Sequence, residues 1–119
     1  MTNLWDPQQN ILVGVRFLKY LDSYWKGSVR DSTERMKFVL ASYNVGLSHV
    51  IDAQKLSRKY GRKINAWDDN VEYFLIKKSN PKYYRDAVVA AGYCRCDGPV
   101  WYVKKVLQRY EEYKIHIAA

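Results

Sequence analysis

The sequence has 119 residues, a length that fits one domain rather than two. Apolar residues make up 48% of it, which excludes an intrinsically disordered chain, and its apolar runs are far too short to span a membrane. The formal net charge of +8 favours an anionic partner such as nucleic acid, an acidic membrane surface or an acidic polymer. The start of the sequence does not show the pattern of a secretory signal peptide.

Apolar residues recur at helical spacing from the start of the chain. Asp6 can cap a first helix and Pro7 suits its first position, while Gly27 and Ser28 end it. The apolar residues of this helix predict a stripe that is buried in the core, formed by Ile11, Val15, Leu18 and Leu21.

Two further helices are predicted from the same kinds of signal. Asp31 and Glu34 have the spacing of a capping pair, and the helix behind them ends at Gly46. A third helix is predicted over residues 48–60, with Gly61 as its terminator. Its inward side would carry Val50, Ile51, Ala53, Leu56 and Tyr60.

Polar residues and prolines divide the second half of the chain. Residues 68–70 can start a fourth helix, which the Asn80-Pro81 pair interrupts because the residue before a proline is pushed out of helical geometry. Residues 83–84 fall in a short turn or a single helical turn, and residues 87–97 are ambiguous between extended and helical structure. Gly98-Pro99 starts a last helix. We therefore expect a single all-α domain of about five helices.

The two cysteines, Cys94 and Cys96, stand in a C-x-C spacing. Such close neighbours strain a disulfide bridge, and two thiols cannot complete a tetrahedral zinc site. His49 and His116 lack the spacing of a ligand pair. We therefore expect two ordinary thiols near a turn, whose redox state the sequence leaves undecided, and neither a metal nor a cofactor.

Basic residues gather in two places that could contact nucleic acid. The first is the end of the third helix, with Lys55, Arg58, Lys59, Arg62 and Lys63. The second is Lys82-Tyr83-Tyr84-Arg85, whose rings could stack on bases. Cations at a helix C-terminus are also favoured by the helix dipole, so a solvated face is the stronger interpretation of the first cluster.

The carboxylates show no pattern typical of general acid catalysis. Asp68-Asp69 sits where helix-starting acids are expected, and the adjacent pair Glu111-Glu112 belongs to a solvated helix face. Glu34 is explained by its capping position, whereas Glu72 and Asp86 lack a distinctive context.

Residues 41–46 read A-S-Y-N-V-G, which by composition is a helix end. Asn44 nevertheless carries the donors and the acceptor needed to bind an acetamido group. Two other blocks accompany this hexapeptide. One is D-P-Q-Q-N-I of residues 6–11, followed by Gly14 and Arg16-Phe17-Leu18, and the other is Gly92-Tyr93-Cys94-Arg95, followed by Pro99-Val100-Trp101-Tyr102-Val103.

In chain order, these blocks resemble the motifs D-P-x-x-N-I-x-x-G-x-x-Y-L, A-x-Y-N-x-G and G-Y-x-R…P-x-x-Y-V of lytic murein transglycosylases. This is the soluble (SLT) family of the goose-type lysozyme-like superfamily. Arg35, Phe38, Leu40 and Ala41 also match the helix before the second motif. The resemblance covers nearly the whole chain, although each block alone would be weak.

The resemblance implies a lysozyme-like helical fold and cleavage of the bond between N-acetylmuramic acid and N-acetylglucosamine, giving a 1,6-anhydromuramoyl end. A single glutamate acts as general acid and then as base. In the family it lies in an E-S block, followed by a G-L-M-Q block, and both precede the first motif. Because only residues 1–5 precede Asp6, we expect an incomplete domain over residues 1–119, the C-terminal half, with the general acid upstream of Met1. Cys94 and Cys96 also depart from the family, which usually has small residues there.

By the same resemblance, Asn44 would position the acetamido group of the glycan and Tyr43 would line the cleft. Tyr102 would form a hydrogen bond near the general acid, and Tyr93 is a further cleft candidate. We expect Asn44 and Tyr102 to approach a common groove. The implied partners are peptidoglycan glycan strands in the periplasm or cell envelope, and nucleic acid is the less favoured partner. The alternative is a non-catalytic basic module that binds glycan or nucleic acid.

An incomplete domain should also expose apolar surface that its missing helices would cover. Exposed apolar patches larger than a few hundred Å² usually mark an interaction site. We therefore expect a homodimer or a higher assembly that buries this surface.

Overall fold

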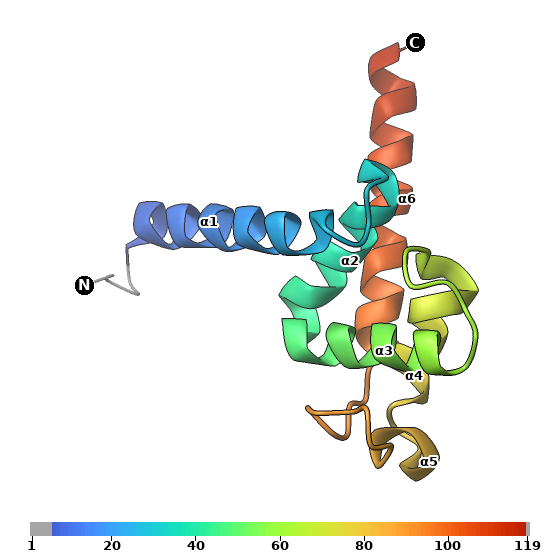
Figure 1. Ribbon diagram of the computed structural model, residues 1–119. Helices are drawn as coiled ribbons and strands as arrows, with labels where there is room; N and C mark the ends of the chain where they lie inside the picture. Colours follow the sequence, from blue (N-terminus) through green and yellow to red (C-terminus); the bar gives the residue numbers. More distant parts are fainter. Residues whose placement is uncertain (1–5, 119) are drawn as a thin grey trace.

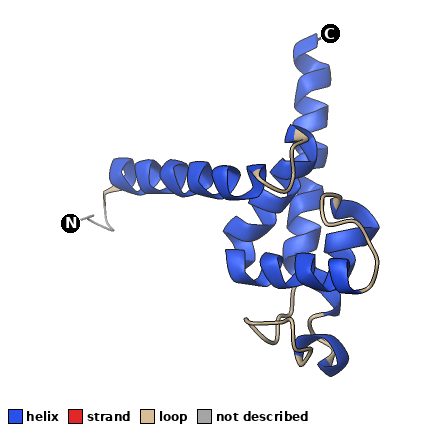
Figure 2. Cartoon of the chain, viewed as in Figure 1, coloured by secondary structure: helices blue, strands red, loops and turns tan. Residues whose placement is uncertain are grey.

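The computed structural model describes residues 6–118, with side chains through residue 115, and this part of the chain contains helices and no strand (Figure 2). The order of elements is α1 (Pro7–Lys26), α2 (Ser32–Val45), α3 (Leu47–Lys59), the wide helical turn η1 (Trp67–Val71), α4 (Glu72–Lys77), α5 (Pro81–Tyr84) and α6 (Asp97–Ala118). The prediction of an all-α fold is confirmed.

The helices form a body from which two helices project. Figure 1 shows α2, α3 and α4 gathered around the first part of α6, with α2 packed against α1, α3 and α6. The first half of α1 and the last half of α6 extend away from this body in different directions. The short helix α5 and the residues that follow it lie beyond α3 and α4.

Local capping explains where the helices begin. The Asp6 carboxylate accepts a hydrogen bond from the Gln8 N–H at 2.9 Å, and the Asp31 carboxylate accepts one from the Glu34 N–H at 3.0 Å. Asn80 caps α5 in the same way, through the Lys82 N–H at 3.0 Å. The starts at Asp6 and Asp31 are the ones predicted from the sequence, whereas Asn80 was predicted only to interrupt a helix.

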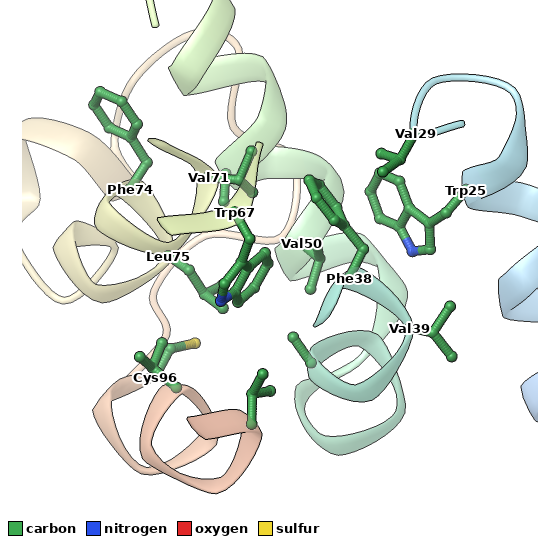
Figure 3. Packing of buried hydrophobic residues seen from close by; sticks show 14 of the residues in the cluster. Trp25, Val29, Phe38, Val39, Val50, Trp67, Val71, Phe74, Leu75 and Cys96 are labelled. Atoms are coloured by element: carbon green, nitrogen blue, oxygen red, sulfur yellow. The ribbon is translucent and has the colours of Figure 1, made fainter. Parts of the chain in front are cut away.

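The core lies between α2, α3, α4 and the first turns of α6. Aromatic rings form a chain through it, because the Phe38 ring lies 5.0 Å from Trp25 and 5.2 Å from Trp67 between ring centroids (Figure 3). The Trp25 Nε1–H donates to the Ser42 hydroxyl at 2.9 Å, which satisfies both groups in a buried setting. This hydrogen bond joins the end of α1 to the end of α2.

The predicted burial of the apolar stripe on α1 is wrong for most of its length. Leu21 is fully buried, but Ile11 is 65% exposed, Val15 43% and Leu18 36%. The periodicity identified the apolar face correctly, because these residues share one side of the helix. Among the described residues, however, no helix packs against the first half of that face (Figure 1).

Two other expectations need correction or completion. Asp68 and Asp69 do not start the fourth helix: their backbone is not helical, Asp69 has φ +60°, and α4 begins at Glu72. Residues 85–96, which include most of the ambiguous segment, contain turns and irregular backbone. The last helix starts at Asp97, in agreement with the predicted Gly98-Pro99 start.

We expect Ser42→Ala to lower the free energy of unfolding by about 1–3 kcal/mol, because it leaves the buried Trp25 indole N–H without its acceptor. Denaturant unfolding followed by tryptophan fluorescence measures this loss. The control is Ser79→Ala, which removes an exposed hydroxyl bonded at 3.3 Å to its own helix end and should change stability by less than about 0.5 kcal/mol. Equal losses in the two variants would contradict the assigned role of Ser42.

Candidate functional site

The predicted glycan-binding pair, Tyr43 and Asn44, lies at the C-terminal end of α2. Gly46 ends this helix with φ +102°, a conformation that favours glycine, and its N–H donates to the Ser42 carbonyl oxygen at 2.9 Å. The chain then turns directly into α3. Both side chains are exposed, so the Asn44 amide is accessible to a ligand.

The first motif lies beside this helix end. The Tyr43 ring packs against Phe17 of α1 with 5.8 Å between ring centroids. A Cβ added at Gly14 would lie 3.7 Å from the Tyr43 hydroxyl, an ordinary van der Waals distance, so this hydroxyl lies directly beside Gly14 of α1. Two of the sequence motifs therefore meet in space and form an aromatic wall next to Asn44.

The other two predicted site residues come from the last part of the chain. Tyr102 is 39% exposed on α6, where it borders a small depression together with Trp101 and Arg109. Tyr93 is 57% exposed, and its ring meets Tyr84 edge-to-face at 5.7 Å. It borders a different depression, which Ile76, Ser79 and Arg95 share.

The structure places Tyr43 and Asn44 side by side at the end of α2, and Tyr93 and Tyr102 border two separate depressions. Helices α2 and α6 pack against each other, so the helix that carries Tyr102 is a direct neighbour of the helix that ends at Asn44. The shared groove of Asn44 and Tyr102 stays a prediction.

Glu72 has one property of a general acid, because burial raises the pKa of its carboxyl. The neighbouring Lys104 ammonium, 3.5 Å away, acts in the opposite direction. One carboxyl oxygen of Glu72 is buried without a hydrogen-bond partner. The side chain lies where α4 packs against α6 and is paired with Lys104 there.

The interpretation of Glu34 as a capping residue is only partly right. Its backbone N–H donates to Asp31, but its carboxylate accepts from the Trp67 N–H at 3.0 Å and pairs with Lys37 at 2.8 Å. Lys37 also pairs with Asp68 at 3.0 Å. Glu34 therefore connects α2 to the start of η1.

Several residues of the predicted basic surface are engaged within the protein. The Arg62 guanidinium lies 4.0 Å from the Tyr73 ring centroid and donates to the Asp69 carbonyl oxygen at 2.6 Å. The Lys59 ammonium pairs with Asp86 at 2.7 Å. The Tyr83 and Tyr84 rings pack against other aromatic rings instead of standing free for base stacking.

Sequence reasoning missed a buried polar cluster between α3 and α4. Lys78 and Asp52 are both fully buried, and the Lys78 ammonium lies 2.7 Å from the Asp52 carboxylate and 2.6 Å from His49 Nδ1. The carboxylate also accepts from the N–H groups of Ala90 and Ala91, both at 2.8 Å. Asp52 is the residue that could have indicated this cluster in the sequence, because it is a charged residue within the apolar run from Val50 to Ala53.

The same contacts shift the pKa values of Lys78, Asp52 and His49. Burial lowers the pKa of Lys78 below its ordinary value, against the effect of Asp52. Burial acts to raise the pKa of Asp52, but Lys78 and the two backbone N–H groups outweigh it and hold that pKa below its ordinary range. Burial and the Lys78 ammonium together lower the pKa of His49.

The expectation of two separate thiols is wrong, because Cys94 and Cys96 form a disulfide. Their Cα atoms are 5.4 Å apart, within the usual range for a bridge, so the close sequence spacing does not prevent it. Both residues are buried next to the start of α6. Within residues 6–115, no cluster of three or more His, Cys, Asp or Glu side chains is arranged to hold a metal ion.

Comparison with known proteins agrees with the motifs that meet at this site. Residues 1–66 match the family model of the transglycosylase SLT domain. The chain is 38% identical over 114 residues to a membrane-bound lytic murein transglycosylase F of Maricaulis maris, and 34% identical over 111 residues to one of Desulfosudis oleivorans. These alignments cover 96% and 93% of the chain but only 23% and 24% of the relatives.

The chain therefore belongs to the transglycosylase SLT family, and its all-α architecture is of the lysozyme-like helical type. It spans about a quarter of the length of the curated relatives it matches. The relatives are named membrane-bound, and none of the described helices of this chain is long and apolar enough to cross a membrane.

We expect the free energy of unfolding to fall as the pH is lowered from about 7 to about 5, and His49→Asn to make this fall smaller. The folded chain lowers the pKa of His49 below 6.5, so its contribution is present above that value and is lost as the pH falls toward the folded pKa. Asn can still accept from Lys78 but does not titrate. Urea unfolding at several pH values measures the slope.

The control is His116→Asn, which removes the other histidine of the sequence. The pKa of Asp52 is below its ordinary value, so Asp52 changes the stability only below about pH 4, outside this window. An unchanged slope in His49→Asn, or an equal change in both variants, would contradict the prediction.

Proposed function

We propose that this chain forms part of a peptidoglycan lytic transglycosylase, in which it supplies one wall of the glycan cleft. The complete enzyme would cleave the bond between N-acetylmuramic acid and N-acetylglucosamine and leave a 1,6-anhydromuramoyl end. The observation that carries the proposal is the exposed Asn44 amide beside the Tyr43–Phe17 wall, because it joins two family motifs at one place.

The chemistry of this wall suits an N-acetylated sugar. The Asn44 amide can donate to the acetamido carbonyl oxygen and accept from its N–H, which fixes the orientation of the ring. The aromatic faces of Tyr43 and Phe17 offer an apolar surface to the C–H groups of the sugar, and the tyrosine hydroxyl adds a polar contact. We assign Tyr102 and Tyr93 to the same glycan surface as further contacts.

The proposed reaction also needs a carboxylic acid that is protonated when the substrate arrives and can later take the proton back. Glu34 is committed to Lys37 and the Trp67 N–H, and Glu72 is buried against Lys104. We therefore assign the general acid to a glutamate upstream of the Asp6-Pro7 motif, as in the family. On this view residues 1–119 are one part of an SLT domain.

The charge and the relatives support an envelope location for this activity. The net charge of +8 complements a wall polymer that carries muramyl and peptide carboxylates. The relatives named membrane-bound lytic murein transglycosylase F act, by their name, on murein. A basic module that binds glycan or nucleic acid without catalysis is the second candidate, and the net charge is the observation that favours it.

We expect the purified chain to bind chitotetraose weakly and Asn44→Ala to reduce that affinity at least about fivefold, because the amide contacts are lost. Titration followed by NMR chemical shifts measures both values. Asn65→Ala, which removes an exposed amide outside the proposed cleft, is the control and should leave the affinity unchanged. Binding that is insensitive to Asn44 would reject the assigned role.

We expect the chain alone not to cleave peptidoglycan, because a positioned general acid is worth about 10²–10⁴-fold in rate and none is available at this wall. The test incubates the chain with murein sacculi and searches for 1,6-anhydro muropeptides by mass spectrometry. Joining an upstream segment with its glutamate should restore activity. Products that disappear with Glu72→Gln or Glu34→Gln would show that the acid lies within this chain.

We also propose that the exposed apolar face of α1 is covered by self-association when the chain is studied alone. Ile11, Val15 and Leu18 lie on this face, and their exposure is unfavourable in water. Sedimentation at increasing concentration should show a dimer or a higher assembly, and Val15→Glu should shift it toward monomer. Arg16→Glu, a charge change at an exposed position of α1 away from this face, is the control. A monomer at high concentration would contradict this proposal.

A further inference from the structure

A basic groove lies on the side of α3 that faces residues 87–90, at the other end of the helix from Asn44. Its volume is about 600 Å³. One wall carries Lys55, Arg58 and Lys59, and the opposite wall is the apolar segment Ala87–Ala90. In Figure 1 this segment belongs to the loop that follows α5, below α3.

The apolar wall of the groove is held in place by the protein. The Val88 N–H donates to the Asp86 carboxylate at 3.0 Å, and the Ala90 N–H donates to the buried Asp52 carboxylate at 2.8 Å. Lys59 pairs with Asp86 at 2.7 Å across the groove. These contacts fix the distance between the two walls before any ligand arrives, which lowers the entropic cost of binding.

Two cations of the groove remain without an acidic partner. Among the described residues, Lys55 and Arg58 form no ion pair, whereas the charge of Lys59 is matched by Asp86. Capping of the helix end does not account for them. The last carbonyl groups of α3 accept from backbone N–H groups, as in the bonds from Tyr60 to Leu56 and from Arg62 to Ser57.

The groove therefore combines free positive charge with aliphatic surface, a combination that suits carboxylates on a chain of small apolar residues. Base stacking is less favoured, because the nearby Tyr83 ring is packed against Tyr60 and Phe74. We propose that this groove binds a short acidic peptide, with Lys55 and Arg58 on its carboxylates and Val88 and Val89 against its methyl groups.

If the proposed function holds, the natural source of this peptide is the stem peptide of peptidoglycan, and this identification rests on that function. The distance agrees with such a link. The first residue of α3 follows Asn44 closely in the chain. At about 1.5 Å per residue, Lys55 and Arg58 lie roughly 12–17 Å further along the helix. A stem of four extended residues spans about 13 Å. One muropeptide could thus contact both ends of α3.

The test titrates the full chain with the sugar-free stem tetrapeptide, which carries free carboxylates, and follows NMR chemical shifts. The shifts should concentrate at residues 55–59 and 87–90, and the double variant Lys55→Gln/Arg58→Gln should weaken binding about tenfold. The double variant Lys26→Gln/Arg30→Gln removes the same charge elsewhere and should leave binding unchanged. The same peptide with amidated carboxylates should bind at least about tenfold more weakly.

The outcomes separate the groove from the proposed glycan site. Peptide binding must be insensitive to Asn44→Ala, and chitotetraose binding must be insensitive to the Lys55/Arg58 variant. Peptide binding without chitotetraose binding would support the groove and reject the glycan site. Shifts spread over the surface, equal losses in the two double variants, or an oligonucleotide that displaces the peptide and binds more tightly would overturn the proposal.

Discussion

The Asp52 carboxylate is the group on which the arrangement of the second half of the chain depends. It lies on α3, pairs with Lys78 just after α4, and accepts the N–H groups of Ala90 and Ala91. Desolvating two charges costs several kcal/mol per ion, so such a pair persists only when nearly all of its hydrogen bonds are made. The cluster meets this condition. The Lys78 carbonyl oxygen also accepts from the Cys94 N–H at 3.2 Å, which extends the connection toward α6.

The same constraint places the surfaces to which we assign function. Because Asp52 fixes residues 90–91, it fixes one wall of the basic groove and the segment that leads to Tyr93. The Trp25–Ser42 hydrogen bond performs the equivalent task at the other end of α3, since it holds the end of α2 against α1 and thereby places Tyr43 beside Phe17. Helix α3 is the rigid spacer between these places.

Local signals in the sequence predicted the helices well, because a cap acts within a few residues of the helix it starts. Asp6 and Asp31 are examples. Signals that depend on distant partners failed. The apolar stripe on α1 specified a face but not what covers it, and the Asp52–Lys78 pair joins residues 26 positions apart. The motif at Tyr43 and Asn44 could be recognised, whereas its contact with Gly14 and Phe17 required the fold.

The charged residues of the described chain divide into those that hold the structure and those left for ligands. Asp52 and Asp86 each bind a cation and a backbone N–H, and these partners hold the pKa of each carboxyl below its ordinary value. The Glu34 carboxylate is likewise bonded to a cation and a backbone N–H. A general acid needs the opposite environment, apolar and without a tight cationic partner. Asn44, Lys55 and Arg58 do face solvent, but they can bind and orient a substrate without donating a proton to it. On the function proposed above, this chain therefore supplies a binding surface, and catalysis would use a carboxyl group brought to that surface from another segment.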